Sequence, residues 1–540
     1  MRRIGTEVSG VGLTTKRGVR WEIFIPAASF VFVVMGLVAA GGDVYVKAVK
    51  SSFAAIITQV GWMFGPATIL FVGILFYCMF SRVGNVKIGG ENAEKLLNPA
   101  SFFGIVITGL TGTGLIFYGA VEPVYHFMNP PSHVGVTAGT PEAAVYSMGQ
   151  TYMHWTFNVF AIYALLSLTA ALVIYNLKYT FSVSSLLRPI FGKYVDGIGG
   201  LIIDLLLIFA MVLGNVYSLG QVLISVGSGN EYVFGLTKNG MQYFLISGGL
   251  ITVSLLCLKS GIAKAVKSVA NFNMYIFYGM LAFFIVLGPF ALMFGLASEG
   301  FAYYLDNLFS LSFVNGVASG ERWPSIWTIA FYGSWAGVGP IVALFLGKIG
   351  RGYTIRQYLY CIFLGGIAFY MFWFAVFGGS GIQAEMNFGD IYSTVKEKGF
   401  ERGIYILFSH YPLGMLMSTV YIFVSLLSFV TTMTAKIDAM SGMCMRGINA
   451  DNLETPFLMK LWWGIYAAFM GWACATFLGF DGVRMFAGFA GVAGMGITVL
   501  TAFSLMWMLQ HVQHREDGTS ILDETTFKDS FISKIGKREQ

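Results

Sequence analysis

Runs of about 20 or more predominantly apolar residues recur along this 540-residue chain, and they limit its fold more than any other feature. A helix of roughly that length crosses the hydrocarbon core of a bilayer. Charged residues make up only 11% of the chain, too few to cover the surface of a soluble protein of this length. The sequence therefore excludes a large soluble protein and predicts an all-α integral membrane protein.

We predict twelve transmembrane helices, near residues 21–41, 57–81, 101–125, 144–176, 199–226, 241–258, 269–295, 324–347, 356–380, 411–435, 457–477 and 483–510. The first apolar run begins at Trp21 and is too long for a signal-peptide core, so we expect it to be retained. Residues 300–315 are amphipathic and fit a helix at the membrane interface. The polar termini, 1–20 and 511–540, are expected to be mobile tails.

The number of lysine and arginine residues alternates between high and low in successive connections between the predicted helices. The two termini and the alternate loops, with the helix ends beside them, hold 25 of the 33 basic residues, and the intervening loops hold 8. Cytoplasmic loops carry this excess of positive charge in membrane proteins. The pattern favours an even number of helices and places both termini in the cytoplasm. We expect a multi-pass protein of a bacterial inner membrane.

No group of residues indicates catalysis. The five cysteines are scattered without disulfide or CxxC spacing, and the six histidines form no metal-ligand motif. The run Thr111–Gly114 resembles a phosphate-binding loop only superficially, because it lies inside a predicted transmembrane helix. The sequence therefore predicts no enzyme, no cofactor and no nucleic-acid partner.

Four ionisable residues lie in or beside the apolar runs: Glu122, Asp204, Lys436 and Asp438. Charged groups are costly inside a bilayer and are candidates for function wherever they occur there. Glu122 and Lys436 lie near predicted helix ends, so an interfacial position explains them equally well. Both interpretations remain open at this point.

Glycine-rich segments interrupt the third helix at Thr108–Gly114 and the eighth at Gly333–Pro340. Broken helices at corresponding places in two halves are typical of the binding sites of secondary transporters. The spacing pairs helices 3–7 with helices 8–12 and leaves the first two outside the repeat. We expect both segments to be unwound.

Two aromatic clusters differ from ordinary lipid-facing rings. Trp155, Phe160 and Tyr163 lie in the fourth helix, and Phe331, Tyr332 and Trp335 lie in the eighth. On a continuous helix Trp155 and Tyr163 point about 80° apart. Rings that face one cavity attract a cation without hydrogen-bond donors, and each desolvated contact contributes about 0.5–2 kcal/mol. The alternative is that all six rings simply pack in the core.

Four motifs, in order along the chain, resemble the betaine/choline/carnitine transporter family. They are Gly112–Pro123, His154-Trp155 with Ala161–Tyr163, Asn271–Met274, and Trp327–Trp335 continuing to Gly352. The resemblance implies a leucine-transporter-like fold of two inverted five-helix repeats, assembled as a homotrimer. It also implies that Trp155, Phe160, Tyr163 and Trp335 form the substrate cage.

The resemblance divides the chain into six parts. These are the N-terminal tail 1–20, two peripheral helices and a linker 21–100, a first repeat 101–295, an outer interfacial helix 296–323, a second repeat 324–510, and the C-terminal tail 511–540.

The resemblance further implies a sodium ion as coupling ion. Its site would lie between Thr108 and Thr111 of the third helix and Ser428, Thr431 and Thr432 of the tenth. These tenth-helix hydroxyls could instead bond back to carbonyls of their own helix. Sodium-independent exchangers of the family carry an arginine in the seventh helix, where this chain has Met274. Sodium symport is therefore the predicted mechanism.

The substrate remains open among trimethylamine, trimethylamine N-oxide and glycine betaine. Tyr332, Ser334 and Val338 stand where the family has tryptophans, which changes the volume and stacking surface of the site. The third helix lacks the aspartate of choline carriers, so choline is disfavoured. The alternatives are a sodium-independent exchanger of betaine or carnitine-like compounds and an amine sensor that transports nothing.

Overall fold

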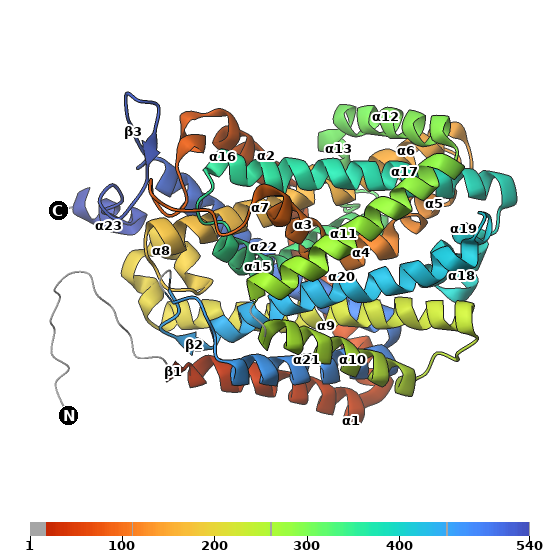
Figure 1. Cartoon of the computed structure of the whole chain (residues 1–540), viewed down its shortest axis with the longest axis horizontal. Coiled ribbons are helices and arrows are strands. Elements are labelled where there is room, and N and C mark those ends of the chain that lie inside the picture. The colour runs from red at the N-terminus through yellow and green to blue at the C-terminus, as the bar shows by residue number, and fades with distance from the viewer. Residues whose placement is uncertain (1–17, 111, 260–261, 450–451, 539–540) are drawn as a thin grey trace.

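The computed structural model describes residues 18–110, 112–259, 262–449 and 452–538, and their regular structure is almost entirely helical (Figure 1). The first half contains α1 (Trp21–Val60), α2 (Phe64–Phe80), α3 (Pro99–Leu110), α4 (Gly112–Tyr118), α5 (Val121–Met128), α6 (Pro141–Trp155), α7 (Phe157–Ala171), α8 (Arg188–Phe191), α9 (Ile198–Phe234), α10 (Gly240–Lys259) and α11 (Ile262–Leu287).

The second half contains α12 (Phe290–Asp306), α13 (Leu308–Phe313), α14 (Trp323–Ile326), α15 (Thr328–Ile349), α16 (Ile355–Leu359), α17 (Gly365–Phe388), α18 (Ile391–Lys398), α19 (Phe400–Ser409), α20 (Gly414–Met443), α21 (Phe457–Phe477), α22 (Gly479–Leu509) and α23 (Phe531–Arg538). Two antiparallel pairs of short strands complete the described structure: β1 (Gly18–Val19) with β2 (Met445–Arg446), and β3 (Gln513–His514) with β4 (Ser520–Ile521).

Nine segments of the described chain are helical, long and apolar enough to cross a membrane. They correspond to nine of the twelve predicted helices. The other three predictions fall on α1, on α3 to α5 and on α21, which are helical but outside this group. The membrane-protein class is thus confirmed, and the count of twelve stays a prediction.

Three predicted boundaries are wrong. Residues 42–56 were expected to form a loop but belong to α1, and the chain turns only at residues 61–63. No proline interrupts 42–56, and isolated glycines cost a helix only about 1 kcal/mol each. The seventh predicted helix ends at Leu287, because Pro289 disfavours helical geometry in the residue before it. The amphipathic helix predicted over 300–315 starts earlier, as α12.

The predicted interruption of the eighth helix is also wrong. α15 runs continuously from Thr328 to Ile349, through Pro340. Its glycines serve close packing instead. A Cβ atom on Gly491 of α22 would lie 2.4 Å from the Cα of Gly333, and one on Gly347 would lie 2.8 Å from the Cβ of Ala170 in α7. Small residues let helix backbones approach in this way.

The C-terminal segment is folded rather than mobile over residues 512–538. The strands β3 and β4 form a hairpin, and its backbone accepts hydrogen bonds from Asn85 at Gly518 and from Asn176 at Leu522. The Asn176 side chain also accepts from the backbone N–H of Gly89. These bonds tie the tail to loops far away in the sequence.

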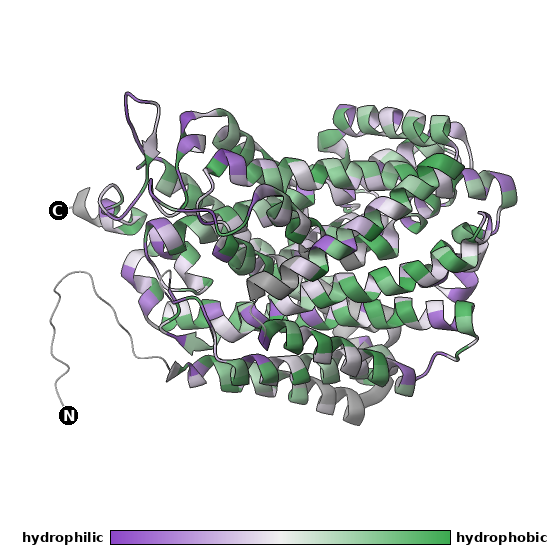
Figure 2. Ribbon diagram, viewed as in Figure 1, coloured by the Kyte–Doolittle hydropathy of each residue, from purple (hydrophilic) through white to green (hydrophobic). Residues whose placement is uncertain are grey.

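Segments predicted to share one side of the membrane lie at one end of the molecule. In Figure 1 the strands β1 to β3 and the helices α8 and α23 gather at the left end, and α18 and α19 lie at the opposite end. Figure 2 shows hydrophobic residues along the long helices and hydrophilic residues concentrated in the connections at the two ends. The arrangement agrees with the alternation of basic residues.

Asp204, a predicted functional candidate in α9, has a structural partner. Its side chain is fully buried, and its carboxylate lies 2.8 Å from Arg20 Nη1. The backbone N–H of Ser184 donates to the same carboxylate at 2.9 Å. Asp204 therefore anchors the segment before α1 and the turn before α8 to the middle of the bundle.

We expect Arg20→Gln to destabilise the protein by about 3–5 kcal/mol, because it leaves the buried Asp204 carboxylate without its counter-charge. Thermal unfolding in detergent measures the change. Arg446→Gln is the matched control, since the pair of Arg446 with Glu22 is exposed and contributes no more than about 1 kcal/mol. Equal melting temperatures for the two variants would contradict the prediction.

Candidate functional site

A break in the helix at Thr156 separates α6 from α7 and sets the position of Trp155. Thr156 adopts φ −122° and ψ −118°, and its hydroxyl donates to the carbonyl of Tyr152 at 2.5 Å. Trp155 is the last residue of α6, and Tyr163 lies in α7 beyond the break. The expected 80° between these two rings assumed a continuous helix, which the break at Thr156 interrupts.

Beside Tyr217 of α9, five aromatic rings from four other helices line one cavity. They are Tyr118 of α4, Trp155 of α6, Tyr163 of α7, and Phe331 and Trp335 of α15. Centroids of neighbouring rings lie close together: 4.7 Å for Tyr163 and Trp335, 5.6 Å for Tyr118 and Trp155, and 5.8 Å for Trp155 and Trp335. We call these five residues the aromatic box.

Two of the six predicted ring residues lie outside the cavity lining. Phe160 packs behind the box, with its centroid 5.5 Å from Trp335 and 5.0 Å from Tyr370. The hydroxyl of Tyr332 accepts a hydrogen bond from Asn158 Nδ2 at 3.1 Å, in a buried cluster away from the cavity. The structure therefore brings Trp155, Tyr163, Phe331 and Trp335 together around the cavity and places Phe160 and Tyr332 in the layer behind them.

Sequence reasoning did not assign four residues that line the cavity: Tyr118, Tyr217, Ser218 and Gln221. Tyr118 lies within the motif Gly112–Pro123, so the family resemblance could have indicated it as a site residue. Tyr217, Ser218 and Gln221 lie on one stretch of α9. No local pattern distinguishes that stretch from the rest of a buried apolar helix.

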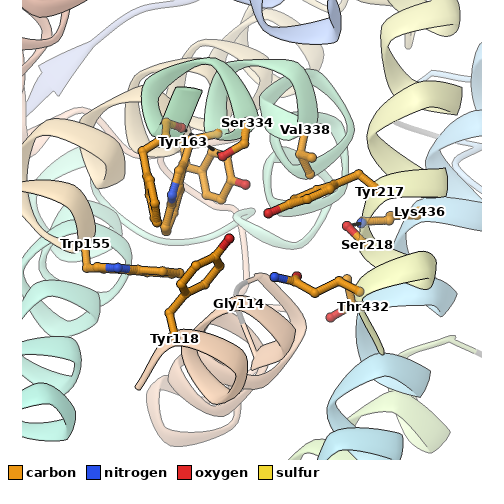
Figure 3. A pocket seen from close by; sticks show the side chains of 13 residues that line it. Gly114, Tyr118, Trp155, Tyr163, Tyr217, Ser218, Ser334, Val338, Thr432 and Lys436 are labelled. Atoms are coloured by element: carbon orange, nitrogen blue, oxygen red, sulfur yellow. Dashed lines mark hydrogen bonds between the residues drawn. The ribbon is translucent and has the colours of Figure 1, made fainter. Parts of the chain in front are cut away.

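The end of the cavity opposite the rings is polar. Figure 3 shows Trp155 and Tyr118 on one side, and Lys436, Ser218 and Thr432 on the other. Lys436 Nζ donates to Ser218 Oγ at 2.5 Å, and its side chain is only 2% exposed. Lys436 of α20 is therefore buried inside the bundle, and an interfacial position is ruled out.

Glu122 of α5 holds the Trp155 ring from behind. Trp155 Nε1 donates to Glu122 Oε2 at 2.6 Å, and His154 Nδ1 lies 2.7 Å from Glu122 Oε1. His154 Nε2 lies in turn 3.2 Å from Thr328 Oγ1 at the start of α15. All these groups are buried. The network therefore fixes the orientation of one wall of the box and connects α5, α6 and α15.

His126 joins this network, which no histidine motif in the sequence indicated. Its Nε2 lies 3.4 Å from Glu122 Oε1, and one donor atom from each of Glu122, His126 and His154 lies within 4.8 Å of the others. The two histidines are far apart in the sequence and come from different helices. Only the tertiary fold brings them together.

The predicted sodium ligands are described only in part. Thr111 and the side chain of Thr108 lie outside the described residues. Asn273 Nδ2 of α11 donates to Ser428 Oγ of α20 at 2.7 Å. Thr431 and Thr432 donate to the carbonyls of Leu427 and Ser428, at 3.2 and 3.0 Å. The two threonines thus donate to carbonyls of their own helix. This is the alternative to sodium binding that the sequence left open.

Comparison with known proteins identifies the family. Residues 22–514 match BCCT, the betaine/carnitine/choline family of transporters. The chain belongs to this family. The resemblance inferred from the four motifs is thereby confirmed, and the protein is a multi-pass membrane transporter rather than an enzyme.

Three relatives illustrate the range of similarity. The chain is 28% identical to the glycine betaine transporter OpuD of Bacillus subtilis, over 85% of this chain and 87% of OpuD. It is 28% identical to glycine betaine transporter 1 of Vibrio parahaemolyticus, over 78% and 79% of the two chains. It is 26% identical to the betaine/ectoine transporter LcoP of Corynebacterium glutamicum, over 78% of this chain and 66% of LcoP.

We expect Glu122→Gln to raise the KM for the transported solute by a factor of about 2 to 30, the equivalent of one cation–π contact of about 0.5–2 kcal/mol. Trp155 and His154 contact the two different oxygens of Glu122, and a glutamine has an acceptor oxygen at only one of these two positions. Uptake kinetics in proteoliposomes measure the change. Glu321→Gln is the control, because Glu321 also pairs with a histidine, His133, at 2.7 Å but does not line the cavity. An unchanged KM in folded Glu122→Gln protein would show that Glu122 does not position the ring.

Proposed function

We propose that the chain is a sodium-coupled symporter that takes up a small methylated ammonium solute: trimethylamine, trimethylamine N-oxide or glycine betaine. The observation that supports the solute class best is the aromatic box, in which rings from four helices line one buried cavity. A methylammonium head is covered by methyl groups and has at most one hydrogen-bond donor, so ring faces that exclude water suit it.

The position of the box supports transport across the membrane rather than surface binding. The box residues belong to α4, α6, α7 and α15, and α9 and α20 close the cavity on its other side. Several of these helices can cross a bilayer. A cavity between membrane-crossing helices is the usual place for the solute of a secondary transporter.

Sodium coupling has support from the packing of α20. This helix packs against α3 and α4, and the Tyr421 hydroxyl donates to the carbonyl of Ile116 in α4. Ser428 and Thr432 contribute hydroxyl oxygens on the same helix, and Thr432 lines the cavity. Hard oxygen ligands of this kind suit sodium. Met274, at the position where exchangers of the family carry arginine, provides no substitute charge.

The proposal includes the arrangement that the family resemblance implies. Twelve membrane crossings form two inverted five-helix repeats, and three copies of the chain assemble as a homotrimer. Both termini face the cytoplasm of a bacterial cell, with the protein in the inner membrane. The clustering of β1, β2, β3 and α23 at one end of the molecule supports a common side for the two termini (Figure 1).

Uptake of labelled trimethylamine, its N-oxide and glycine betaine into proteoliposomes tests the proposal. We expect at least one solute to accumulate only when an inward sodium gradient is imposed. Vesicles with equal sodium on both sides are the control for passive equilibration. Counterflow that needs no sodium would favour the sodium-independent exchanger instead, and saturable binding without accumulation would favour a sensor.

We expect Tyr163→Leu and Trp335→Leu each to raise the KM for the transported solute by a factor of about 2 to 30, because each removes one ring from the box. Trp462→Leu is the matched control. Its ring stacks on Tyr466 of α21 and does not line the cavity. If both box variants kept the KM of the original protein, the solute head would have to bind elsewhere.

A further inference from the structure

The amino group of Lys436 lies at the polar end of the cavity and has no acidic partner in the part of the chain that the structure describes. Among the described residues no carboxylate oxygen lies within 4.0 Å of its ammonium group. Asp438, the nearest acid in the sequence, pairs with Lys348 at 2.9 Å and with Lys460 at 3.2 Å. A buried ammonium group is costly unless an anion pairs with it, so an anion that enters the cavity would stabilise the charged form of Lys436.

The hydrogen bonds of Lys436 leave most of its donors unused. An ammonium group has three N–H donors, and the contact with Ser218 Oγ takes one of them. Ser218 donates its own hydrogen to the carbonyl of Gly214 at 3.1 Å, so its oxygen acts as the acceptor for Lys436. The remaining donors of Lys436 are available to a group in the cavity.

Gln221 adds a second donor that lacks a partner. It lies in α9 one helical turn from Ser218, lines the same cavity and is only 2% exposed. In the described part of the chain its Nε2 has no hydrogen-bond partner. Buried donors normally find an acceptor, so an unpartnered amide beside an unbalanced ammonium points to a missing acceptor that carries negative charge.

We infer that Lys436 and Gln221 form an anion subsite that binds the carboxylate of a zwitterionic solute, while the aromatic box binds its methylammonium head. This inference rests on the proposed function, since it assigns the head of the solute to the box. The two ends of the cavity then match the two charges of a betaine. Charge-assisted hydrogen bonds from the ammonium group strengthen the binding of the carboxylate.

The anion subsite discriminates among the solutes whose methylammonium head the aromatic box can bind. A solute with only a cationic head, such as trimethylammonium, would leave the free donors of Lys436 and Gln221 without an acceptor. A betaine is therefore the preferred solute, and bare methylammonium cations bind poorly.

Calorimetric titration of the purified full-length chain tests the subsite without any substitution. The buffer contains sodium gluconate, so that chloride cannot take the place of the carboxylate. The ligands are glycine betaine, its methyl ester, tetramethylammonium and 3,3-dimethylbutyrate, which keeps the carboxylate but has an uncharged head. We expect glycine betaine to bind at least about tenfold more tightly than the ester, the equivalent of about 1.4 kcal/mol.

Variants then assign the preference to Lys436. Lys436→Met, which keeps the length of the side chain but not its charge, should abolish the preference for betaine over its ester. Lys436→Arg should retain most of it, and Gln221→Leu should reduce it. Lys460→Met is the control, since that lysine is buried and pairs with Asp438 but does not line the cavity.

The outcomes separate the two proposals. Equal affinity of the original protein for betaine, its ester and tetramethylammonium would overturn the anion subsite and leave the aromatic box intact. Equal affinity for betaine and 3,3-dimethylbutyrate, or binding of no methylammonium compound at all, would overturn the proposed function. A preference for betaine that survives in folded Lys436→Met protein would also overturn the assignment to Lys436.

Discussion

The close packing of α15 against α7 and α22 is the interaction on which the cavity depends. A side-chain carbon on Gly491 would clash with Gly333, and one on Gly347 would clash with Ala170. Helices in a bilayer gain little from hydrophobic burial against one another, so close backbone contact through small residues is a main source of their attraction. This packing brings Phe331 and Trp335 of α15 into contact with the rings of α6 and α7.

The buried charged residues of the bundle differ in the partners that they contact. Asp204 and Asp438 have basic partners that tie loops and helix ends together. Glu122 accepts hydrogen bonds from groups that hold the wall of the aromatic box. Lys436 is different, because within the described part of the chain its side-chain hydrogen-bond partner is the neutral hydroxyl of Ser218. An ammonium group without an acidic partner in the cavity favours the binding of a solute that carries a negative charge at that point.

Several predictions were wrong for the same reason, which is that one local sequence pattern is compatible with two different structures. Glycines at 333–340 are typical both of unwound helices and of close helix contacts, and the sequence of α15 alone does not show that α22 lies against it. The Trp155–Tyr163 spacing was interpreted on a continuous helix, but Thr156 bends the chain between them. Phe160 and Tyr332 are aromatic like their neighbours in the sequence, but their side chains lie behind the residues that line the cavity.

The sequence by itself determined the membrane-protein class, the family and most of the long helices, because apolar run length, basic-residue alternation and ordered motifs are local properties of the chain. It also identified four of the five rings of the aromatic box. Only the tertiary structure decided that Tyr118 completes the box, that Glu122, His126 and His154 meet behind Trp155, and that Lys436 and Gln221 face the same cavity. These groups come from helices far apart in the sequence, and their proximity depends on how the helices pack rather than on any periodicity within one of them.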